Sequence, residues 1–112
     1  MSKSDFLQAW VEITEDLDKR MALAAAYRRE VENFAIELKN LIKYYNERGY
    51  PFTLQRNEDD DYIFRILPSN KAVREELVLD CRNQKNFNAE TFLEAAIVFC
   101  DTSIEKAQKI TN

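Results

Sequence analysis

The sequence of 112 residues has no histidine, one glycine and two prolines. Histidine is the side chain that most often serves as a general base or activates a nucleophile, so its absence argues against most acid–base and nucleophilic catalysis. A single glycine excludes the glycine-rich loops that cradle phosphate groups. An enzyme built on this chain would depend on carboxylates, with Glu75, Glu76 and Asp80 as candidates. Solvated charge on a short helix is the simpler interpretation, so we expect no catalytic site and no cofactor.

Cysteine is also scarce, since Cys81 and Cys100 are the only two. Both lie in apolar stretches without CxxC spacing, which favours two reduced, buried thiols over a disulfide or a zinc site. The acidic run from Glu58 to Asp61 could bind a hard cation through its carboxylate oxygens. It lacks the alternating ligand spacing and the central glycine of a calcium loop. We therefore predict a solvated turn there, and no metal site.

Long hydrophobic runs are missing as well. The runs from Met21 to Tyr27 and from Ala95 to Cys100 have only seven and six residues, which is too short to span a membrane. The first residues, Met-Ser-Lys-Ser-Asp, show no apolar signal region, so we expect a cytoplasmic protein. The net charge of −4 disfavours nonspecific attraction to nucleic acid or anionic membranes.

The stretch from Ser2 to Gly49 contains no proline, and no glycine before its last residue. Its apolar residues recur at alternating spacings of four and three, interrupted only by Arg20. Members of this stripe are Phe6, Trp10, Ile13, Leu17, Ala24, Tyr27, Val31, Phe34, Leu38, Leu41 and Tyr45; a second column beside it carries Leu7, Met21, Ala35 and Ile42. Ser2 with Asp5 resembles a capping box, and Gly49 followed by Pro51 is a stop signal. The pattern predicts a helix over about residues 3–48, with an apolar face wider than a two-stranded coiled-coil seam.

The remainder of the chain changes period. Alternating residues predict a β-hairpin over about residues 52–67, with Phe52, Leu54, Tyr62, Phe64 and Ile66 facing the core. The spacing of Val73, Leu77 and Cys81 favours a helix over about residues 71–82, although Leu77 to Leu79 could instead form a third strand. A final helix over about residues 89–110, capped by Asn88, is apolar on every side and is expected at the centre of the core. The predicted fold is a single, mostly helical α+β domain over residues 1–112, in the order α-β-β-α-α.

The length of the first helix suggests a function. An unbroken helix of this size would extend roughly 70 Å, whereas a compact chain of this length measures only about 35 Å across. The helix should therefore either break near Thr14 to Ala26 or have its amino-terminal part covered by a partner. We favour the partner, in a homodimer. The candidate interface residues are Phe6, Trp10, Ile13, Leu17 and Tyr27.

These observations favour a non-enzymatic protein–protein interaction module, such as an adaptor, an inhibitor or a small chaperone. The alternative is a nucleic-acid-binding regulator that would use Arg28, Arg29, Lys39 and Lys43 to contact phosphates. Glutamates interleaved among these cations weaken their field and argue for an ordinary mixed helix face. A carboxylate enzyme is the third hypothesis. The sequence contains no motif that identifies a family.

Overall fold

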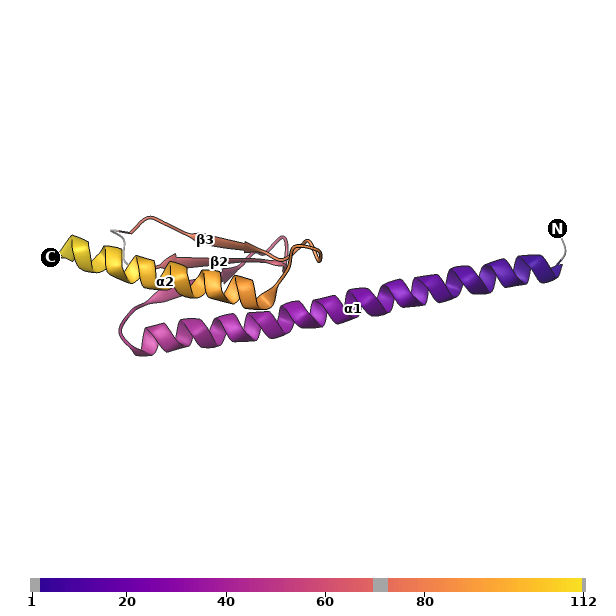
Figure 1. Cartoon of the computed structure of the whole chain (residues 1–112), viewed down its shortest axis with the longest axis horizontal. Coiled ribbons are helices and arrows are strands. Elements are labelled where there is room, and N and C mark those ends of the chain that lie inside the picture. The colour runs from indigo at the N-terminus through magenta and orange to yellow at the C-terminus, as the bar shows by residue number, and fades with distance from the viewer. Residues whose placement is uncertain (1–2, 70–72, 112) are drawn as a thin grey trace. The chain divides into compact units, whose positions relative to one another are not determined.

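The computed structural model describes residues 3–69 and 73–111, and Figure 1 shows their arrangement into two helices and three strands. In chain order these are α1 (Lys3–Glu47), β1 (Phe52–Arg56), β2 (Ile63–Pro68), β3 (Leu77–Asp80) and α2 (Ala89–Thr111). The chain divides into two units, Met1–Glu30 and Val31–Asn112. The described residues of the first unit all belong to α1, and the second unit holds the end of α1, the sheet and α2. Each unit is described by itself below.

The three strands form an antiparallel sheet in the order β1-β2-β3. Leu54 lies opposite Ile66 and Phe64 lies opposite Leu79 in the register. Alternation along the strands buries Phe64, Ile66 and Leu79, whereas Arg65 and Val78 are exposed. One face of the sheet is therefore covered and the other is open, as the period of two requires. The predicted hairpin is confirmed.

The core of the second unit is organised around the ring of Phe34, on α1. This ring packs edge-on against the rings of Phe64 on β2 and Phe92 on α2, at centroid distances of 5.9 Å and 6.1 Å. Phe87, just before α2, is closer still at 5.5 Å. A further link joins the two helices, because the hydroxyl of Tyr45 donates a 2.7 Å hydrogen bond to Asp101 Oδ1. The end of α1 and α2 thus pack together on the covered face of the sheet.

The two helix-end signals predicted from the sequence, the Gly49 stop and the Asn88 cap, are both present in the structure. Gly49 has a φ of +83° and closes α1, with hydrogen bonds from Gly49 N to Asn46 O (3.2 Å) and from Tyr50 N to Tyr45 O (3.0 Å). This pair of bonds is a Schellman motif, which favours glycine because other side chains are strained at positive φ. Asn88 caps α2, since its Oδ1 accepts a 3.0 Å hydrogen bond from Thr91 N.

The predicted helix over residues 71–82 is wrong. Leu77–Asp80 is the strand β3, and residues 73–76 have no regular structure, while residues 70–72 lie outside the described part of the chain. The every-fourth-residue spacing of Val73, Leu77 and Cys81 is compatible with a helix, but pairing with β2 decides the outcome. A two-stranded hairpin is only marginally stable and gains from a third strand. The observed order is therefore α-β-β-β-α.

The structure also corrects the predicted burial of the last helix and shows whether the first helix is continuous. The helix α2 is not buried on every side, because Ala96 and Cys100 are inaccessible while Val98 is 63% exposed. It runs without a break from Ala89 to Thr111. Likewise, α1 shows no break from Thr14 to Ala26 and runs as one long helix.

Candidate protein-interaction surface

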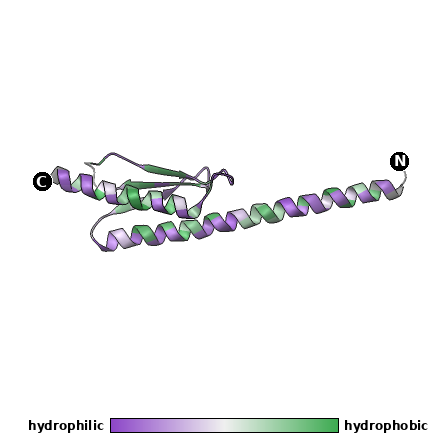
Figure 2. Cartoon of the chain, viewed as in Figure 1, coloured by the Kyte–Doolittle hydropathy of each residue, from purple (hydrophilic) through white to green (hydrophobic). Residues whose placement is uncertain are grey.

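Five large apolar side chains lie on one side of α1 within the unit Met1–Glu30. Successive helical residues are rotated by about 100°, so positions 7, 10, 13, 17 and 21 fall within an arc of about 120°. Each of these side chains is between 51% and 70% exposed. We call this set, Leu7, Trp10, Ile13, Leu17 and Met21, the amino-terminal apolar face. Figure 2 shows the hydrophobic bands that recur along α1.

Polar side chains occupy the opposite side of the same helical segment. Gln8, Glu15 and Lys19 lie roughly half a turn away from Trp10. Arg20, which interrupts the apolar stripe, forms an ion pair with Asp16 one turn earlier, at 3.1 Å. The segment is consequently amphipathic, with an apolar side wide enough to receive another helix.

The predicted interface residues have different surroundings. Trp10, Ile13 and Leu17 are all exposed and share the amino-terminal apolar face, whereas Tyr27 is only 8% exposed and does not belong to it. The side chain of Phe6 lies outside the described residues. Leu7 and Met21 belong to the exposed face but were not predicted as interface residues. The second apolar column of the sequence contained the signal for them, because it runs beside the main stripe.

The four predicted phosphate contacts divide between the two units. Lys39 and Lys43 are exposed and stand one turn apart on α1, where Lys43 also lies 3.8 Å from Glu47. Arg28 and Arg29 belong to the first unit and are exposed. As consecutive helical residues they point about 100° apart.

The three carboxylates considered under the enzyme hypothesis each pair with a cation instead of with one another. Each one faces a different cation: Glu75 pairs with Lys106, Glu76 lies 3.6 Å from Arg65, and Asp80 lies 2.6 Å from Arg82. Hydrogen bonds from Arg82 hold the pKa of Asp80 below its ordinary value. The carboxylate of Asp80 is thereby held in its ionised form, which makes it a poor proton donor.

The acidic turn and the two thiols also have structural surroundings. Asp60 Oδ1 accepts a 3.0 Å hydrogen bond from Tyr62 N, which stabilises the turn between β1 and β2. Across the described ranges, no three acidic, cysteine or histidine side chains are grouped so that they could hold a metal ion. Burial raises the pKa of Cys81 and that of Cys100 to about 12, so both thiols stay protonated at neutral pH.

Among the described residues, no helix has both the length and the apolar character needed to cross a membrane. The candidate surface is an exposed helical face of the unit Met1–Glu30. Comparisons with protein-family models, with curated proteins and with solved structures gave no match.

Proposed function

We propose that this protein is a non-enzymatic interaction module that forms a homodimer through the amino-terminal apolar face. The observation that supports this proposal is the exposure of five large apolar side chains on one side of a single helix. Monomeric proteins rarely leave contiguous apolar surface of this kind uncovered, and such patches mark sites of association. A helix in a protein gains most of its stability from packing its apolar face. Binding of a partner to this face would therefore stabilise the helical segment.

A second copy of the chain fits this surface. Two identical apolar faces of equal length are self-complementary around a two-fold axis, which is the commonest symmetry of soluble dimers. Three consecutive alanines, Ala24 to Ala26, follow the face and would allow a neighbouring backbone to approach closely. In an adaptor, an inhibitor or a small chaperone, the same face could exchange the second copy for a helix of the target protein.

The test is a single charge placed within the face. Leu17→Glu introduces a carboxylate that would lose its hydration in the dimer without gaining a partner. Gln8→Glu is the matched control, because it adds the same charge to the polar side of the same helix segment. Light scattering after size exclusion should show a dimer for the original protein and for Gln8→Glu, and a monomer for Leu17→Glu. A monomer in all three cases would overturn the proposal.

Nucleic-acid binding is the alternative function. The observation in its favour is that Lys39 and Lys43 are exposed on α1, where they could contact phosphates. Titration with duplex and single-stranded nucleic acid at low and moderate salt decides between the two. Phosphate contacts are strongest at low salt, so a lack of binding there removes the alternative. The carboxylate-enzyme hypothesis has the least support, because each of its candidate side chains forms an ion pair with a different basic side chain.

A further inference from the structure

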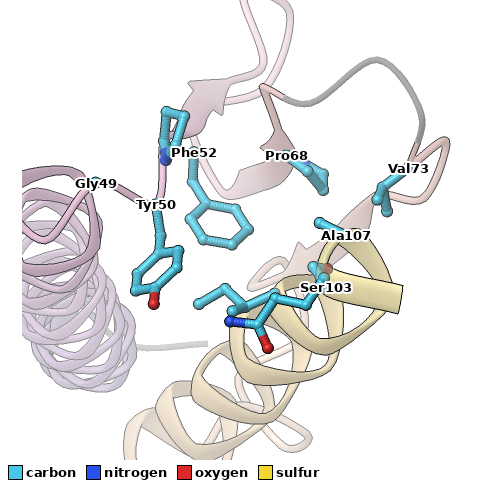
Figure 3. Close-up of a pocket in the computed structure, with 10 residues that line it drawn as sticks. Gly49, Tyr50, Phe52, Pro68, Val73, Ser103 and Ala107 are labelled. Carbon is cyan, nitrogen blue, oxygen red and sulfur yellow. The ribbon is translucent and has the colours of Figure 1, made fainter. Parts of the chain in front are cut away.

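A pocket of about 210 Å³ opens in the unit Val31–Asn112, between the turn after α1, the end of β2 and α2. Figure 3 shows the rings of Tyr50 and Phe52 on one side of this space and Pro68 on another. Ser103 and Ala107, one turn apart on α2, line the wall formed by that helix. The pocket is thus lined by the turn after α1, the first residue of β1, the end of β2, Val73 and α2.

Ser103 is the unusual member of this lining. Its side chain is only 3% exposed, and its Oγ has no hydrogen-bond partner among the described residues. A serine inside a helix commonly donates its hydroxyl proton to the carbonyl one turn earlier, but no such bond is formed here. A buried hydroxyl without a partner is energetically unfavourable, so a ligand atom that can bond to it would relieve this cost.

The other lining residues define the chemistry of the ligand. None of the described residues that line the pocket is charged, and most of the wall is aromatic or aliphatic. An ion would lose its hydration here without gaining an opposite charge. The volume exceeds that of an apolar cavity of about 150 Å³, which is known to hold benzene.

We infer that this pocket binds a small, uncharged, mostly apolar molecule with one hydrogen-bonding oxygen, about the size of phenol. The ring of such a ligand would pack against Tyr50 and Phe52, and its oxygen would pair with Ser103 Oγ. This inference does not depend on the proposed dimer, because the pocket is lined only by residues of Val31–Asn112.

The test compares phenol with toluene, which has the same number of non-hydrogen atoms but no hydroxyl. Amide chemical shifts of the whole protein are followed by NMR as each probe is added. Both probes should shift the resonances of Phe52, Ser103 and Ala107, with dissociation constants on the order of 1 mM. Phenol should bind roughly two- to tenfold more tightly, because a neutral hydrogen bond contributes that much to affinity.

Three variants complete the experiment. Ser103→Ala should retain toluene binding and lose the preference for phenol. Ala107→Leu should fill the pocket and prevent binding of both probes, whereas Ala95→Leu, at an exposed position of α2, should leave both unaffected. The inference is overturned if neither probe shifts these resonances, if Ser103→Ala keeps the full preference, or if Ala107→Leu binds both probes normally.

Discussion

The two parts of α1 carry one apolar stripe but differ in its burial. In the unit Val31–Asn112, the stripe residues Val31, Phe34 and Leu38 are at most 1% exposed. In Met1–Glu30, Trp10 and Leu17 follow the same spacing and are 59% and 51% exposed. The spacing of apolar residues therefore specifies the helix in both places, whereas burial depends on what packs against it. This contrast is the reason to treat the exposed part as a binding surface.

The contrast predicts a large difference between two aromatic truncations. Phe34→Ala removes the ring at the centre of the core and should lower the free energy of unfolding by about 3–5 kcal/mol. Trp10→Ala, on the exposed part of the stripe, should change the stability of the monomer by less than about 0.5 kcal/mol. Urea unfolding followed by circular dichroism, at a concentration where dimers are not populated, measures both. Equal losses would contradict the division of α1 into a core part and a surface part.

Alkaline pH should weaken only the unit that holds the core. Burial raises the pKa of the Cys81 and Cys100 thiols from 9.0 to about 12, so the folded state favours the protonated thiol. This contribution to stability is fully present below about pH 9 and is lost as the pH rises toward 12. At about pH 11 the loss should be on the order of 2 kcal/mol for each thiol.

Cys100→Ala is the control for this pH dependence. Its unfolding free energy, measured by urea titration at several pH values, should fall less steeply above about pH 9 than that of the original protein. An unchanged slope would show that the Cys100 thiol is not shielded from solvent in the folded state.

A change in the opposite direction, a modest gain in stability, is expected from Ser103→Ala. Removing a buried hydroxyl that has no partner should raise the free energy of unfolding by about 1 kcal/mol. Alanine is also a better helix former than serine, so Thr102→Ala, at the exposed neighbouring position, measures the propensity gain on the same helix. Thermal unfolding compares the two variants. A loss of stability in Ser103→Ala would mean that the hydroxyl is satisfied by a bound water molecule.

Local signals in the sequence were sufficient for much of the fold. The Gly49 stop, the Asn88 cap and the alternation in the hairpin were all predicted, because each depends on neighbouring residues only. The strand β3 was mispredicted because its four residues are stabilised by pairing with β2, a partner distant in the sequence. The one-sided burial of α2 has the same origin, since local apolarity does not reveal which side the sheet covers.

The candidate sites divide in a similar way. The apolar spacing placed Trp10, Ile13 and Leu17 on one stripe of the helix. The length of the helix then indicated that this segment would extend beyond the core. The pocket around Ser103 could not be predicted, because it is formed by segments distant in the sequence that meet only in the folded chain. Locally, Ser103 follows Asp101 and Thr102 and precedes Ile104, a context that a solvated serine would share.

Fluorescence of Trp10 over a dilution series tests the central claim most directly, because this is the only tryptophan in the chain and it lies within the amino-terminal apolar face. In a homodimer that buries this face, the emission should be blue-shifted at high concentration and should move to the red on dilution. Leu17→Glu should give red-shifted emission at every concentration. Red-shifted emission from the original protein at all concentrations would contradict a dimer formed through this face.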